Sequence, residues 1–138
     1  MFDVHDKETR SYNMSMIKSK DTKPELLVRR YLFNKGFRYK LHVRKLPGTP
    51  DLVFPRRRTV IFIHGCFWHG HDGCKFYVIP RTRRAWWIRK IGHNKELDAK
   101  NAAILRRSGW KVLSVYECSL RTSIRERTLG RLATRLAG

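Results

Sequence analysis

The feature that most constrains the fold of this chain is an apolar run that ends in a cluster of histidines and cysteines. Residues 60–63, Val-Ile-Phe-Ile, read as a buried strand, and the segment HGCFWHGHDGC follows at once as residues 64–74. This segment holds three of the six histidines and two of the three cysteines, with Phe67 and Trp68 between them. Soft metal ligands, imidazoles that can transfer protons and aromatic rings the size of a base therefore gather at the end of one strand.

The chain also carries a large excess of positive charge. Its 138 residues include 31 Lys and Arg against 11 Asp and Glu, a formal net charge of +20. Self-repulsion at such a charge destabilises a compact chain, and nucleic acid is the usual anionic partner that offsets it. A ribosomal-type basic protein is the plainer alternative. A membrane partner is disfavoured, because the sequence has no apolar span of about 20 residues and no long basic amphipathic helix.

The cysteine usage fits a reducing compartment. The first six residues, MFDVHD, are polar and no apolar segment of a secretory signal follows them, so we expect a cytoplasmic protein. Thiols stay reduced there, and three cysteines cannot all pair within one chain. Because two of them lie beside histidines, metal binding explains them better than disulfides do.

The pattern of apolar residues predicts one α/β domain, residues 1–138, with a central mixed sheet flanked by helices. Residues 1–20 read as a short N-terminal helix or arm that packs little of itself. A capping box, Thr22-Lys23-Pro24-Glu25, begins a helix that ends at Gly36. The remaining predicted elements are a strand 37–43, a hairpin of strands 51–54 and 59–63, helices 83–91 and 93–107, a strand 110–116 and a basic helix at about 122–137.

The hairpin allows a geometric prediction for Asp51. If Phe54 pairs with the first residues of the second strand, Asp51 lies opposite Phe62 or Ile63, about 5 Å away. Its carboxylate then lies beside the backbone carbonyl of Ile63 and the ring of His64. A carboxylate, a carbonyl oxygen and water are the ligands that Mg²⁺ accepts, so the sequence predicts a magnesium site here.

Both acidic residues of this region also have plainer explanations. Asp51 follows Thr49-Pro50 and would be ordinary as a turn residue, although Asp is depleted directly before an apolar strand. Glu25, at the start of the first long helix, can reach the same region, but the capping box alone accounts for it.

Three cysteines and one histidine make a standard structural zinc set. The predicted ligands are Cys66, His71, Cys74 and Cys118. Buried thiols beside a surface histidine are the alternative, and His69 competes with His71 as the fourth ligand. If His71 binds the metal, His69 is left free, and a free imidazole can take a proton from water. His64 is open to the same two interpretations.

Two pairs of adjacent aromatics, Phe67-Trp68 and Trp86-Trp87, suggest contact with bases. One member of each pair is expected in the core, because neighbours in a loop or helix seldom both point inward. Exposed aromatics on a basic protein stack on bases or wedge between base pairs, so whichever member of each pair is exposed is a candidate DNA contact.

Taken together, these residues closely resemble the very-short-patch repair (Vsr) DNA mismatch endonucleases. The resemblance runs from about residue 3 to residue 120. It is carried by residues 6–14, 46–51, 60–69, 90–94 and 109–118, and the segment from Phe62 to His69 is the most specific of these.

The resemblance implies a restriction-endonuclease-like fold with a structural Zn²⁺ site. It implies a Mg²⁺-dependent nick on the 5′ side of the thymine in a T·G mismatch, which arises when 5-methylcytosine deaminates. The expected partner is double-stranded DNA that contains this mismatch, with mismatch-repair proteins as possible assistants. A monomer in the bacterial cytoplasm, associated with the nucleoid, suffices for one nick.

Site roles follow from the resemblance residue by residue. Asp51 and the carbonyl of Ile63 are expected to bind Mg²⁺. His69 is expected to act as the base toward the attacking water, with His64 and Glu25 assisting nearby. The expected zinc ligands are Cys66, His71, Cys74 and Cys118, and the expected DNA contacts are Met14, Ile17, Phe67, Trp68 and Trp87, with Trp86 beside them.

The chain departs from the family pattern at two places. Ile63 replaces a residue that is often threonine, which is harmless if only its backbone carbonyl binds metal. The zinc loop, residues 71–74, is one residue longer. The usual catalytic lysine of restriction-type sites has no counterpart after Asp51, as expected if His69 is the base.

Two other function classes share part of this pattern. A non-catalytic zinc module that binds DNA needs the cysteines and arginines, but it does not need Asp51, Glu25 or His69. A restriction-type endonuclease that cuts matched duplex needs the catalytic residues but has less use for wedging aromatics. Metal-dependent nicking distinguishes an endonuclease from the binding module. A comparison of mismatched with matched duplex distinguishes the mismatch enzyme from the restriction-type enzyme.

Overall fold

The computed structural model describes residues 21–75 and 77–138. The predicted N-terminal arm, residues 1–20, lies outside the described residues, as do Met14 and Ile17.

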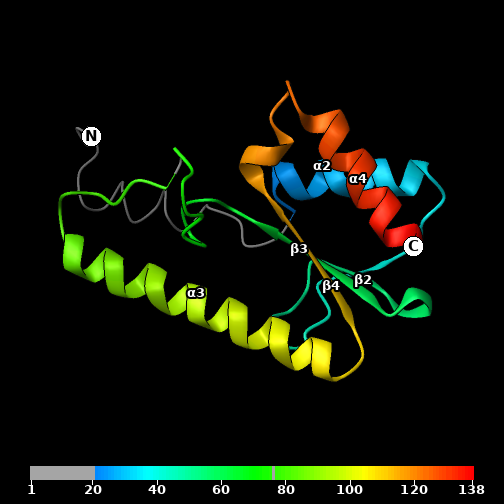
Figure 1. Cartoon of the computed structure of the whole chain (residues 1–138), viewed down its shortest axis with the longest axis horizontal. Helices are drawn as coiled ribbons and strands as arrows, with labels where there is room; N and C mark the ends of the chain where they lie inside the picture. The colour runs from blue at the N-terminus through cyan, green and yellow to red at the C-terminus, as the bar shows by residue number, and fades with distance from the viewer. Residues whose placement is uncertain (1–20, 76) are drawn as a thin grey trace.

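The described chain forms an α/β fold around a mixed sheet of four strands in the order β1-β2-β3-β4 (Figure 1). The strands are β1 Lys40–Leu41, β2 Leu52–Phe54, β3 Thr59–His64 and β4 Lys111–Tyr116. The pairs β1–β2 and β2–β3 are antiparallel, whereas β3 and β4 run parallel. Parallel neighbours end at the same edge of the sheet, so the residues that follow His64 and Tyr116 start side by side.

The predicted hairpin is confirmed. Phe54 pairs with Thr59 and Leu52 with Ile61, and a short 3-10 turn, Pro55–Arg57, connects the two strands. This register fixes the face to which each side chain points, because neighbouring residues of a strand point to opposite sides.

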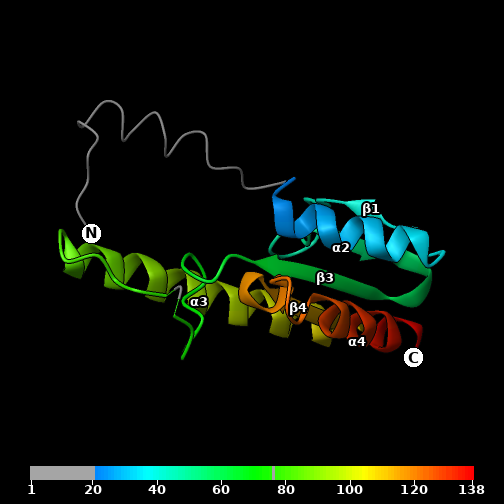
Figure 2. The same cartoon turned by 90° about the horizontal axis from the view of Figure 1, so that it is seen from above.

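Helices cover both faces of the sheet (Figures 1 and 2). Helices α2, Lys23–Asn34, and α4, Arg125–Ala137, lie on one face, and α3, Arg84–Arg107, lies on the other. The core on the α2/α4 side includes Leu32, Leu52, Ile61, Leu113 and Leu132. The smaller core on the α3 side includes Val53, Val60, Leu105 and Val112.

Two predictions from the sequence need correction. The strand expected at 37–43 is reduced to Lys40–Leu41, because His42 has a positive φ of 47° that ends the extended backbone. The helices expected at 83–91 and 93–107 are one continuous helix, α3. A glycine inside a helix costs only about 1 kcal/mol. The burial of Ile91 and Leu105 on the same helix offsets this cost, so Gly92 does not break α3.

The C-terminal helix begins slightly later than expected. A 3-10 segment, Glu117–Leu120, follows β4, and α4 starts at Arg125 rather than near 122. Among the described residues, no helix is both long and apolar enough to cross a membrane.

Candidate active site and metal centres

Asp51 lies where the hairpin places it, at the start of β2 and beside the end of β3. Its Oδ2 accepts a hydrogen bond of 2.7 Å from the backbone N–H of Ile63. Burial, and to a smaller extent the nearby Glu25 carboxylate, raises the pKa of Asp51 to about 6 against the opposing effect of the Ile63 N–H. Asp51 therefore faces a site that disfavours a lone negative charge.

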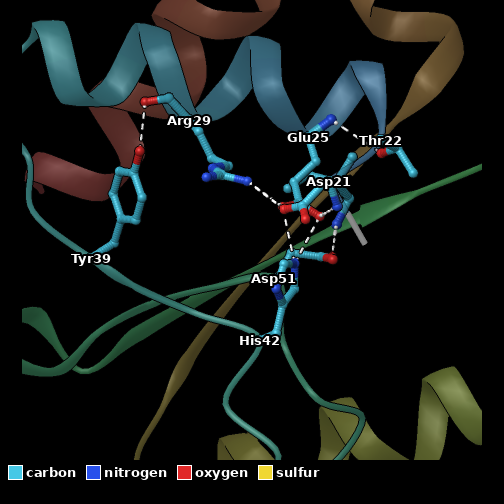
Figure 3. Close-up of polar contacts among 8 residues, drawn as sticks. Asp21, Thr22, Glu25, Arg29, Tyr39, His42 and Asp51 are labelled. Carbon is cyan, nitrogen blue, oxygen red and sulfur yellow. Dashed lines mark hydrogen bonds and ion pairs between the residues drawn. The ribbon is translucent and has the colours of Figure 1, made fainter. Parts of the chain in front are cut away.

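Glu25 points from α2 toward Asp51 (Figure 3) and is only 1% exposed. Thr22 caps the helix as predicted, since its Oγ1 accepts from the N–H of Glu25. The Glu25 carboxylate, however, reaches beyond a capping role. It accepts from the Asp21 N–H at 3.2 Å and from Arg29 Nη1 at 3.1 Å.

His42 is a further partner of Glu25 that the sequence did not predict. Its Nε2 lies 2.9 Å and 3.0 Å from the two Glu25 oxygens (Figure 3). Its backbone N–H donates to the carbonyl oxygen of Asp51 at 3.1 Å, so one residue contacts both acidic positions. Non-glycine residues with positive φ are uncommon and concentrate at functional sites, which makes the φ of 47° at His42 notable.

The residues around Asp51 fit a hard divalent cation. Asp51, His42, Ile63, His64 and His69 line one cavity of about 590 Å³. Mg²⁺ or Mn²⁺ would find oxygen ligands in the carboxylate of Asp51, the nearby carboxylate of Glu25 and the backbone at Ile63. The cavity leaves room for water ligands as well.

His69 is held by a carboxylate from α3. Its Nδ1 lies 2.6 Å from Oδ2 of Asp98. A carboxylate at Nδ1 favours the tautomer with the proton there and leaves Nε2 as the acceptor. No sequence pattern marks Asp98, which falls among many polar residues of a long helix and is brought near His69 only by the packing of α3.

His64 lies beside this pair. Its ring centroid is 4.3 Å from that of His69, and the residue is 7% exposed. Burial lowers the pKa of His64 to about 4, and the neighbouring His69 lowers it as well. His64 is therefore neutral at physiological pH, and its ring can donate or accept a hydrogen bond without bringing a positive charge into the site.

The predicted zinc ligands come together at the shared edge of the parallel strands β3 and β4. One ligand atom from each of four residues lies within 4.8 Å of the others, namely Cys66, His71, Cys74 and Cys118. The Sγ of Cys118 is 3.4 Å from Nδ1 of His71. That spacing suits one edge of a tetrahedron with Zn–S of about 2.3 Å and Zn–N of about 2.0 Å.

The environment of the thiols also fits a structural cation. Cys66 is fully buried, and burial raises the pKa of its thiol to about 12. A thiolate at this position needs a cation to hold it. Of the two histidines that competed for the fourth place, the structure puts His71 among the cysteines and His69 against Asp98.

The four candidate aromatics form one cluster between the loop and the start of α3. Phe67 lies 5.2 Å from both Trp68 and Trp87, and Trp86 lies 4.8 Å from Trp87, between ring centroids. Trp86 is 37% exposed and its ring is stacked by the Arg83 guanidinium. Trp86 and Arg83 therefore share the exposed surface at the start of α3, whereas Met14 and Ile17 lie outside the described residues.

Comparison with known proteins gives consistent matches. A family model described as DNA mismatch endonuclease Vsr matches residues 2–75, a stretch that includes Glu25, Asp51 and Cys74. V.XorIIP of Xanthomonas oryzae pv. oryzae, a type II nicking enzyme, is 48% identical over 113 residues, which cover 82% of each chain.

Two further relatives match over a similar length. The DNA mismatch endonuclease Vsr of Escherichia coli K12 is 46% identical over 121 residues, or 88% of this chain and 77% of that protein. The type II nicking enzyme V.NmeAIP of Neisseria meningitidis is also 46% identical over 121 residues, or 88% of this chain and 86% of that enzyme.

Proposed function

This chain belongs to the Vsr family of DNA mismatch endonucleases, and from that membership we propose that it nicks one strand on the 5′ side of the thymine in a T·G mismatch. The chain is a DNA endonuclease that acts on mismatched DNA. The observation that carries the finer proposal is the meeting of Asp51 and the His69–Asp98 pair at one cavity, with Phe67 and Trp68 on the loop that carries His69. In the cell, such an enzyme would work on the nucleoid, as a monomer and with mismatch-repair proteins as possible assistants.

We propose that the residues divide the reaction as follows. His69 Nε2 takes a proton from the attacking water, while Asp98 orients the ring and stabilises the imidazolium that forms. The attack breaks the bond from phosphorus to the 3′ oxygen and leaves a 3′-hydroxyl and a 5′-phosphate. Asp51 and the Ile63 carbonyl would hold Mg²⁺, which when bound neutralises charge on the scissile phosphate. His64 and Glu25 support the site at its two sides.

Recognition of the mismatch is assigned to the aromatic cluster. Wedging a side chain between base pairs costs a few kcal/mol per step, and a mismatched step costs less than a paired one. Phe67, Trp68 and Trp87 would enter the duplex, with Trp86 at the rim and with Met14 and Ile17 contributing from the N-terminal segment. A mismatch would therefore be selected by its weak stacking as well as by base contacts.

We also propose that the sheet and its helices are the core of a restriction-endonuclease-like fold, in one domain that spans residues 1–138. The support is an acidic residue at the start of a hairpin strand, with a basic or imidazole group at the end of the next strand. Zn²⁺ on Cys66, His71, Cys74 and Cys118 would hold the loop that carries His69.

The deciding experiment compares paired duplexes with Mg²⁺, identical except for one T·G or T·A pair, in several flanking contexts. We expect a nick 5′ of the mismatched thymine alone. Cutting of both duplexes indicates a restriction-type enzyme instead. Tight binding without cutting indicates a non-catalytic DNA-binding module. Asp51→Asn serves as the inactive control for contaminating nucleases.

Replacement of His42 tests the support given to Glu25. His42→Leu removes the hydrogen bonds to both Glu25 oxygens, and we expect the single-turnover nicking rate to fall by about tenfold to a hundredfold, as misplaced groups near a reacting centre do. Duplex affinity should stay nearly unchanged. His42→Gln keeps a donor and should recover part of the rate. Equal rates for the two variants would remove this hydrogen bond from the mechanism.

A further inference from the structure

A further set of metal-binding side chains adjoins Asp51 and lines the same cavity. One ligand atom each from His64, His69 and Asp98 lies within 4.8 Å of the others. We propose that these three residues form an exchangeable site for a transition-metal cation such as Zn²⁺, and that filling it inhibits the endonuclease. The inhibitory part rests on the proposed role of His69 as base, whereas the binding part does not.

The donor set selects against Mg²⁺. Two imidazoles and one carboxylate suit Zn²⁺, Ni²⁺ and Co²⁺, whereas Mg²⁺ requires oxygen ligands in near-octahedral geometry. Asp51 and the Ile63 carbonyl offer only oxygen, and the cysteine site offers mainly sulfur. The same chain therefore presents three chemically different donor sets within a short distance of β3.

The site is open to solvent on one side. His64 is buried, but the side chains of His69 and Asp98 are 29% and 34% exposed. They line a cavity of about 370 Å³ together with Asp72, whose carboxylate holds Lys95 at 3.0 Å. Three protein ligands with one open position are typical of sites whose metal exchanges and keeps a water, in contrast to the closed four-ligand cysteine set.

Occupation of this site would disable His69 whichever ring nitrogen binds. If Nε2 binds the cation, its lone pair is taken. If Nδ1 binds the cation in place of the hydrogen bond to Asp98, the neutral ring must carry its proton on Nε2, which then donates instead of accepting. In both cases the ring cannot take a proton from water, although the fold, the cysteine site and Asp51 are unaltered.

The test measures bound metal directly. Protein with its cysteine site filled by zinc is dialysed against buffered micromolar Zn²⁺ with Mg²⁺ in large excess, and bound zinc is then counted. We expect two zinc ions per chain for the wild type and one for Asp98→Ala and for His64→Ala. Glu96→Gln, an exposed carboxylate on the same helix, should still bind two. Asp98→Ala changes a half-exposed residue, so it keeps the test valid should His64→Ala fail to fold.

Two further readouts distinguish the outcomes. Co²⁺ added to the zinc-filled protein should give weak visible bands without sulfur charge transfer, and these should vanish in Asp98→Ala. Nicking by the wild type should fall about tenfold or more as the second site fills. One zinc per chain in the wild type, or two in Asp98→Ala, overturns the proposal. Two zinc ions without inhibition overturn the inhibitory part. A protein that never nicks mismatched DNA contradicts the proposed function, while the zinc count still decides the site.

Discussion

His69→Ala is expected to abolish nicking of the mismatched duplex while duplex binding and folding stay nearly intact. A positioned base contributes about 10²–10⁴-fold to rate, and His69 Nε2 is the acceptor left available by the contact of Nδ1 with Asp98. The ring is partly exposed, so its removal leaves no large buried cavity. Single-turnover nicking under saturating Mg²⁺ measures the loss, with binding to the same duplex measured in parallel.

The matched variant is Asp98→Asn, which keeps the size of the side chain but offers Nδ1 an amide in place of a carboxylate. We expect a smaller fall in rate than for His69→Ala, because the ring remains but its tautomer and its imidazolium lose their support. If His69→Ala retains full activity, another group is the base and the pair with Asp98 is structural. If the two variants lose duplex binding equally, the pair acts in substrate binding instead.

The geometry at Asp51 was predictable because a hairpin is rigid in register. Side chains alternate along a strand, so a short connection between Phe54 and Thr59 leaves little freedom for the residue opposite the end of β3. The four candidate zinc ligands were predictable in a similar way. Their residue types suit zinc, Cys66, His71 and Cys74 follow one predicted strand, and Cys118 follows another. In the structure β3 and β4 are parallel neighbours, and this brings Cys118 to the loop that holds Cys66.

His42 and Asp98 could not be predicted, because their partners come from distant parts of the chain. His42 meets Glu25 only through a left-handed backbone conformation that local propensity does not specify for histidine. Asp98 meets His69 only through the packing of α3 beside the loop that carries His69, a long-range contact that the local sequence pattern does not specify.

Cys118→Ser is expected to destabilise the whole domain and to remove its zinc. A structural zinc site contributes directly to folding free energy, because its ligands are assembled only in the folded state. Cys118 joins the end of β4 to the loop after β3, through contacts with Cys66 and His71. Each kcal/mol of lost folding free energy lowers the Tm of a domain of this size by roughly 3–4 °C, so a loss of about 4 kcal/mol would lower it by roughly 14 °C. Thermal unfolding and metal analysis of the purified variant measure both effects.

The control is Glu117→Gln, an isosteric change at the exposed neighbouring residue, which should keep the zinc and the Tm of the wild type. Chelation of the wild type should reproduce the low Tm of Cys118→Ser, because both remove the same cation. Loss of the zinc should also displace His69 from its position in the site, since the loop that carries it is anchored at Cys66 and His71 on its two sides. Nicking would then decline along with stability, in contrast to His69→Ala, where the rate falls and the Tm does not. An unchanged Tm and zinc content in Cys118→Ser would leave the cysteines as ordinary buried thiols.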